Sequence, residues 1–154
     1  MDPEMTLTWL EETTLLGEDA TARYFRDQSN AFPEMMRRGK AEGRVLVAII
    51  AVAGFGGAEE ANLLYVLEDP ASPRLEVIVR PAANPVSVAT VFPSASLFER
   101  EISDGFGIPF RDAFDTRRLF LHEMYPDGFH PLARSKKTRD AGEGRSAPFG
   151  FREI

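Results

Sequence analysis

Three acids and one arginine lie close together in the stretch FEREISDGFGIPF, residues 98–110. Two neighbouring carboxylates can act as general acid and general base, as in glycoside hydrolysis. On a helix Glu99 and Glu101 would point about 200° apart, which leaves Glu101 and Asp104, three residues apart, as the pair that could work together. Arg100 lies beside them, and a guanidinium flanked by acids more often joins segments through ion pairs. A small stand-alone soluble enzyme using Glu101 and Asp104 is therefore the alternative to a structural role.

Other patterns for catalysis or cofactor binding fail on spacing. The glycines of GFGG at 54–57 are followed by Glu59 where a dinucleotide fingerprint needs its third glycine, so we expect a turn. His122 and His130 lack a metal-binding spacing, and no serine has a GxSxG context. The chain contains no cysteine, which removes disulfides, thiolate nucleophiles and iron–sulfur ligands. We expect no catalytic, cofactor-binding or metal-binding residue in this chain.

Composition indicates one ordinary globular domain. The chain has 154 residues, 44% of them hydrophobic and 27% charged, and a net charge of −6, which argues against nucleic acid as a partner. The longest apolar run, VLVAIIAVA at 45–53, is about half the length of a membrane span. Since the N-terminus has no secretory pattern, we expect a cytoplasmic location.

The elements that must position the acidic stretch predict an α+β fold. We expect a helix over 18–30 and a short second helix over 32–43, which contains Pro33 in its first turn. Three strands are predicted at 43–54, 61–69 and 74–81, joined by short turns. The expected result is an antiparallel sheet with helices packed on one face, with VLVAIIAVA central and RLEVIVR half exposed.

The acidic stretch itself is expected to lie on a helix. In SASLFEREISDGFG, residues 94–107, Ser96 is the predicted N-cap and Glu99 completes a capping box, while Gly105 and Gly107 end the helix. Beyond it the chain loses periodicity and offers one short candidate strand, RRLFL at 117–121. An extended segment of this length is typically functional or lies on a partner.

Three regions follow from these patterns. Residues 1–17 are an acidic N-terminal segment, residues 18–132 form the α+β domain, and residues 133–154 form an extended basic tail or linker. A basic tail of this kind is either solvated or lies on an acidic partner.

Three motifs together resemble a known family. FEREISDGFGIPF, DTRRLFL and GFHPLARSKK are similar to the pattern of the 30 kDa subunit of NADH dehydrogenase, which is respiratory complex I, and of its relatives in energy-converting hydrogenases and formate hydrogenlyase. The likeness covers roughly residues 44–137. The residues that carry it, or that we expect at a partner contact, are called the signature residues here: Phe98, Glu99, Arg100, Glu101, Asp104, Phe106, Gly107, Ile108, Arg117, Arg118, His130, Pro131, Leu132 and Arg134.

Some family positions differ in this chain. Leu97 replaces a tryptophan, Ser103 an aromatic residue, Gly105 an apolar residue and Ala113 a histidine or lysine. The GFHPL ending matches the family pattern less completely, and it resembles the hydrogenase-type branch more than respiratory complex I proper.

The resemblance implies a non-catalytic assembly role. The chain would carry no cofactor itself, and iron–sulfur clusters, quinone or a nickel–iron site would belong to partner subunits. It would dock against a hydrogenase-like or quinone-reductase-like large subunit, either separate or fused after Ile154, and would meet the membrane only through the complex, at its cytoplasmic face. Arginines of the signature would contact the partner or brace the loop, while Phe98, Phe106, Ile108 and Leu132 would anchor it.

Overall fold

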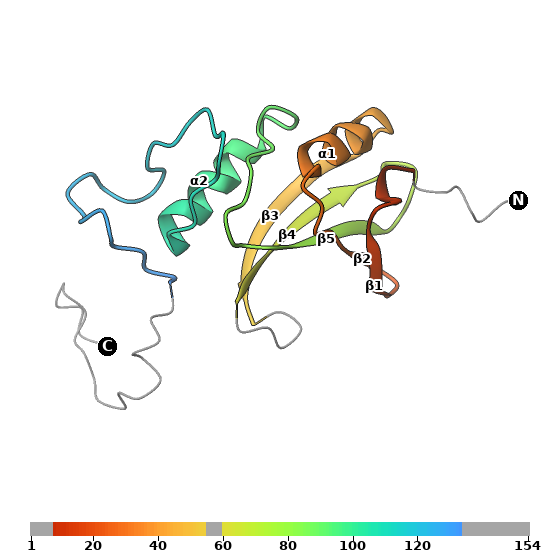
Figure 1. The fold of residues 1–154 in the computed structure, drawn as a ribbon, viewed down its shortest axis with the longest axis horizontal. Helices are drawn as coiled ribbons and strands as arrows, with labels where there is room; N and C mark the ends of the chain where they lie inside the picture. The colour runs from red at the N-terminus through yellow and green to blue at the C-terminus, as the bar shows by residue number, and fades with distance from the viewer. Residues whose placement is uncertain (1–7, 55–59, 134–154) are drawn as a thin grey trace, which may run out of the picture.

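The computed structural model describes residues 8–54 and 60–133. Within these ranges the chain forms one five-stranded sheet, in the order β1-β2-β5-β4-β3, with two α-helices on one face (Figure 1). The rest of the GFGG turn after Gly54, Arg134 and the basic tail lie outside the described residues. The elements are a 3₁₀ turn η1 (Thr8–Leu10), β1 (Thr14–Glu18), β2 (Ala22–Arg26), α1 (Phe32–Ala41), β3 (Val45–Ala53), β4 (Ala61–Glu68), β5 (Leu75–Pro81) and α2 (Ala95–Phe106).

The predicted α+β fold is confirmed. The three expected strands form the antiparallel meander β3-β4-β5, and the predicted helices at 32–43 and 94–107 correspond to α1 and α2. Residues 107–133 contain no helix or strand, only an isolated bridge between Val86 and Arg111. This stretch is the segment without periodicity that the sequence predicted after the helix.

The helix predicted over 18–30 is wrong, because this part of the chain forms β1 and β2. Asp19 stabilises the turn between them by accepting hydrogen bonds from Thr21 and Ala22. Ala22 and Phe25 had suggested one apolar helix face, but three residues apart on a strand they point to opposite faces. Each accordingly joins a different apolar cluster of the sheet.

The order of the strands also differs from the expectation. β2 pairs with β5 in parallel, with Tyr24 opposite Val77, so the sheet is mixed. As a result RLEVIVR in β5 lies inside the sheet and is largely buried, whereas VLVAIIAVA in β3 is an edge strand. The prediction that VLVAIIAVA is central was wrong, because hydrophobicity alone does not reveal which strands supply the outer neighbours.

The main core lies between the helices and the sheet. It contains the fully buried side chains of Trp9, Phe32 and Tyr65, and the rings of Phe32 and Tyr65 meet edge to face at 4.7 Å. Gly39 in α1 allows the close approach of Trp9, since an added Cβ would lie 2.9 Å from the Trp9 ring. A smaller apolar cluster covers the opposite face of the sheet around Leu64.

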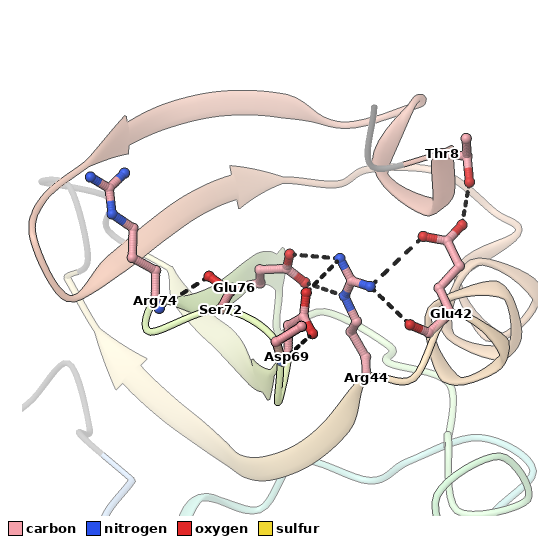
Figure 2. A network of polar contacts seen from close by, with 8 residues as sticks. Thr8, Glu42, Arg44, Asp69, Ser72, Arg74 and Glu76 are labelled. Carbon is pink, nitrogen blue, oxygen red and sulfur yellow. Dashed lines mark hydrogen bonds and ion pairs between the residues drawn. The ribbon is translucent and has the colours of Figure 1, made fainter. Parts of the chain in front are cut away.

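A buried ion network fastens one end of the sheet (Figure 2). Arg44 donates from Nε to Glu76 at 3.1 Å and lies 3.5 Å from Asp69, while its Nη1 donates to the Glu42 carbonyl at 3.0 Å. Glu42 in turn accepts a hydrogen bond from Thr8. The network therefore joins η1, the end of α1, the turn after β4 and β5.

No helix in the described ranges is both long enough and apolar enough to cross a membrane.

Candidate functional site

The signature residues gather around the end of α2 and the segment that follows it. We call α2 together with residues 107–133 the α2 corner. A cavity of about 350 Å³ opens there. Eight signature residues line it: Glu99, Arg100, Asp104, Gly107, Ile108, Arg117, Arg118 and His130.

The Asp104 carboxylate fixes the segment across the corner. Its Oδ2 accepts hydrogen bonds from the backbone N–H groups of Leu119 at 2.7 Å, Phe120 at 2.8 Å and Leu121 at 3.3 Å. Burial alone would raise the pKa of Asp104, but these hydrogen bonds and the charge of Arg118 lower it below its usual value. Asp104 is therefore an ionised structural acceptor.

Arg100 braces the same segment from the preceding turn of α2. Its Nε donates to the Arg117 carbonyl at 2.8 Å and its Nη2 to the Arg118 carbonyl at 3.1 Å. Its Nη1 pairs with Asp115 at 3.3 Å. This guanidinium thus bonds the loop and does not bridge Glu101 to Asp104.

Arg118 and Asp115 extend the bracing along the loop. Arg118 donates to the carbonyls of His122 and Tyr125 and pairs with Asp127 at 2.8 Å. Asp115 also accepts from Arg117, whose hydrogen bonds hold the pKa of Asp115 well below its usual range. The Arg117 side chain is otherwise exposed to solvent.

Glycines let the chain fold back on the helix end. Gly107 is the C-cap of α2 at a φ of 72°, the left-handed region that favours glycine, and an added Cβ would lie 2.6 Å from the His130 ring. His130 Nδ1 lies 3.0 Å from the Asp104 carbonyl oxygen. Leu132 donates its N–H to the Gly105 carbonyl at 2.8 Å, so the segment returns to α2 at both residues.

The capping box predicted at the start of α2 is wrong. The N-cap is Ser94, without a side-chain cap, and Gly105 lies within the helix. Glu99 instead points inward, where it accepts from Ser87 Oγ at 2.6 Å and from the Val88 N–H at 2.8 Å. Burial raises the pKa of Glu99, although these two hydrogen bonds oppose the shift. Its partners come from the loop before α2, so helix spacing could not identify them.

Glu101 and Asp104 do not form a poised acid pair. Glu101 is exposed and does not line the cavity, and the lowered pKa of Asp104 is the opposite of what a general acid needs. In the described part of the chain no three histidine, aspartate or glutamate side chains are grouped as metal ligands. The side chains of the α2 corner can hold the segment after α2 in one conformation, but Glu101 and Asp104 are not placed as a catalytic pair.

The remaining signature residues divide between core and surface. Phe98, Phe106 and Ile108 are partly buried against the main core, whereas Pro131 and Leu132 are exposed. The strand predicted at 117–121 is absent, because the N–H groups of its last three residues bond Asp104 in place of a neighbouring strand.

Sequence reasoning missed several partners of the signature residues: Ser87, Val88, Asp115 and Asp127. Of these, only Asp115 could have been identified from the sequence, since an acid just before the paired arginines in DTRR suggests an ion pair.

Comparison with known proteins gives consistent matches. The family model of the respiratory-chain NADH dehydrogenase 30 kDa subunit matches residues 25–141. The membrane-bound hydrogenase subunit beta of Pyrococcus furiosus is 38% identical over 77 residues, which are 49% of this chain and 44% of that protein. A subunit of the NADH-quinone oxidoreductase of Roseobacter denitrificans is 36% identical over 103 residues, 65% of this chain and 51% of that protein. The chain thus spans about half the length of these relatives.

The fold also occurs in a solved complex. A chain in the structure of the membrane-bound sulfane sulfur reductase, an archaeal respiratory membrane complex, superposes with a TM-score of 0.69 at 16% identity, covering 95% of both chains. At this identity the likeness concerns the fold.

Proposed function

Because the chain belongs to the family of the respiratory-chain NADH dehydrogenase 30 kDa subunit, we propose that it is a subunit, or the domain of one, in a complex I-like or hydrogenase-type membrane complex. Its role there is structural: it docks a hydrogenase-like or quinone-reductase-like large subunit at the cytoplasmic face of the membrane. The redox centres, whether iron–sulfur clusters, quinone or a nickel–iron site, belong to the partner subunits.

The observation that carries this proposal is how the polar groups of the α2 corner are used. Arg100, Asp104 and Arg118 are engaged in holding a segment without helix or strand in one shape. A binding segment that is fixed in advance loses less conformational entropy when it meets its partner. A catalytic site would instead keep such groups available to a substrate.

The same segment displays large apolar side chains. Phe120 and Met124 are 71% and 87% exposed, and Phe114 and Leu132 are also exposed. Exposed apolar side chains of this size on a braced segment are candidates for protein–protein contacts. They supply the surface on which the large subunit would rest.

Co-purification from the native cell tests the proposal. The tagged full chain should recover a hydrogenase-like or quinone-reductase-like large subunit, and Phe120→Asp should reduce that recovery because it places a charge in the contact. Leu16→Asp is the matched control, since Leu16 is exposed on β1 at a distance in the fold from the α2 corner. Recovery of the chain alone, or equal recovery with Phe120→Asp and Leu16→Asp, would refute the docking role.

A further inference from the structure

The cavity of about 350 Å³ at the α2 corner has room for one ligand or one large side chain, since ligand pockets measure roughly 300–1,000 Å³. Its lining includes the apolar side chains of Ile108, Leu121 and Phe129 and the small side chains of Ser103 and Ala113. The cavity therefore suits a group with an apolar body.

The charged side chains that line the cavity already have partners within the chain. Its arginines pair with Asp115 and Asp127. The carboxylates of Glu99 and Asp104 accept hydrogen bonds from backbone N–H groups. A charged ligand would lose its hydration without meeting an unpaired opposite charge on the residues that the structure describes, so an uncharged ligand fits better.

His130 supplies one polar atom that the fold leaves unused. Its Nδ1 lies 3.0 Å from the Asp104 carbonyl oxygen, and because a carbonyl oxygen can only accept, Nδ1 carries the hydrogen. In the neutral ring Nε2 is then an acceptor, and it has no hydrogen-bond partner within residues 8–54 and 60–133. Since His130 lines the cavity, a ligand that donates one hydrogen bond to Nε2 would complete it.

An aromatic ring with a single donor combines these properties. The tyrosine O–H and the tryptophan N–H each lie at the edge of a large apolar body that carries no charge.

A second copy of this chain has no such ring to offer. The chain contains one tryptophan and three tyrosines, and all four are engaged in the fold. Trp9 and Tyr65 are fully buried in the main core, Tyr24 packs on the cluster of the opposite sheet face, and Tyr125 stacks on Phe129. The ring must therefore come from a different molecule.

The residues beside the cavity indicate that this molecule is a protein. Exposed Phe114 follows the lining residue Ala113, and exposed Phe120 precedes the lining residue Leu121. Tyrosine and tryptophan side chains in pockets surrounded by other contacts are the usual hot spots of protein interfaces. We propose that this cavity binds a tyrosine or tryptophan side chain of another subunit, whose O–H or N–H donates to His130 Nε2. This rests on the proposed function, because the large subunit would supply that side chain.

The ligand class is tested on the full chain with two isomers, 3-methylindole and 1-methylindole. They contain the same atoms, but only 3-methylindole keeps the N–H group. In an NMR titration 3-methylindole should bind about fivefold more tightly, the effect of one net hydrogen bond, and should shift the signals of Ala113, Leu121 and His130. Apolar contact alone would favour 1-methylindole, which gives up no hydrogen bond to water, so equal or reversed affinities would overturn the proposal.

Two variants locate the ring. His130→Phe keeps an aromatic ring but removes Nε2, so the two isomers should bind with equal affinity. Ala113→Leu fills the cavity and should weaken both isomers about tenfold, whereas Ala71→Leu, at an exposed residue in the turn after β4, should change neither affinity. Binding that survives Ala113→Leu, or signal shifts outside the cavity, would show that the proposal is wrong. The comparison of isomers on the parent chain decides even if a variant does not fold.

The source of the ring is tested by co-purification from the native cell. If the large subunit supplies it, Ala113→Leu should reduce recovery of that subunit relative to Ala71→Leu. Unchanged recovery together with lost indole binding would assign the cavity to a free small molecule and overturn the proposal. The titration contains no large subunit, so its failure leaves the docking role standing. If the parent recovers no large subunit, the docking role and this source of the ring are both refuted, while the titration still decides the ligand class.

Discussion

Replacing Asp104 with alanine should release the segment that follows α2 while the sheet stays folded. In the folded chain the Asp104 carboxylate accepts from the backbone N–H groups of Leu119, Phe120 and Leu121. The segment contains no helix or strand of its own, so these bonds and those of Arg100 supply much of its order.

The size of the effect follows from the bonds that are lost. A hydrogen bond to a charged group contributes about 1.5–3 kcal/mol. Two of the three bonds are shorter than 3 Å and all are part-buried, so water can replace some of what is lost. We expect local stability of the segment to fall by about 2–3 kcal/mol, which makes amide exchange about 30- to 150-fold faster. The free energy of global unfolding should fall by the same amount, since the lost bonds stabilise the closed native state relative to both the locally open and the globally unfolded chain.

Amide hydrogen exchange at Leu119, Phe120 and Leu121 checks this result, and urea denaturation checks the global stability. Glu101→Ala is the matched control, because Glu101 lies on the same helix but is exposed. If the three amides exchange equally fast in the parent, Asp104→Ala and Glu101→Ala, the bracing role of Asp104 is refuted.

The pH dependence gives a second check. Burial raises the pKa of Asp104, but the backbone hydrogen bonds outweigh it and the folded pKa is lowered. The stabilisation is therefore complete above the unfolded pKa of about 3.9 and is lost as the pH falls through the folded value. Amide protection of the segment should weaken on acidification in the parent, and Asp104→Ala should lack this dependence.

Three further predictions concern stability and are measured by urea denaturation. Gly107→Ala should destabilise the chain more than Gly43→Ala. Both glycines have positive φ, but only at Gly107 would the new Cβ meet another side chain, the His130 ring 2.6 Å away. Equal losses in the free energy of unfolding would contradict this. Arg44→Met should lower the free energy of unfolding by about 3–5 kcal/mol because Glu76 is left buried without its partner. The double variant with Glu76→Leu should recover most of that loss. If it does not recover, the ion pair is not the cause. Burial raises the folded pKa of Glu99, so its contribution to stability is present below the unfolded pKa and is lost as the pH rises through the folded pKa. Glu99→Gln should remove that decline above the unfolded pKa of about 4.3, and parallel pH profiles of the parent and the variant would refute this.

Local sequence patterns were sufficient to predict much of the fold. The β-branched runs of β3, β4 and β5 and the short turns between them predict an antiparallel meander, because strand pairing across a short turn needs only neighbouring sequence. The proline at the start of α1 and the glycines near the end of α2 likewise locate the two helices within a few residues.

The N-terminal hairpin could not be recognised in the same way. A five-residue strand such as β2 shows too few residues to separate a period of 2 from one of 3.6. Its partner β5 lies about fifty residues further along the chain. The edge position of β3 depends on that pairing, so both errors have one cause.

The sequence by itself determined the family: the motif around Arg100 and Asp104 and the match to the family model follow from residue types and their order. Only the tertiary structure decided what those residues do. Glu99 and Asp104 lie five residues apart on one helix, yet one bonds the loop before α2 and the other the loop after it, across 11 to 17 residues of chain. A carboxylate's role and pKa depend on which donors folding brings to it, and that information is not contained in its spacing from its neighbours on the helix.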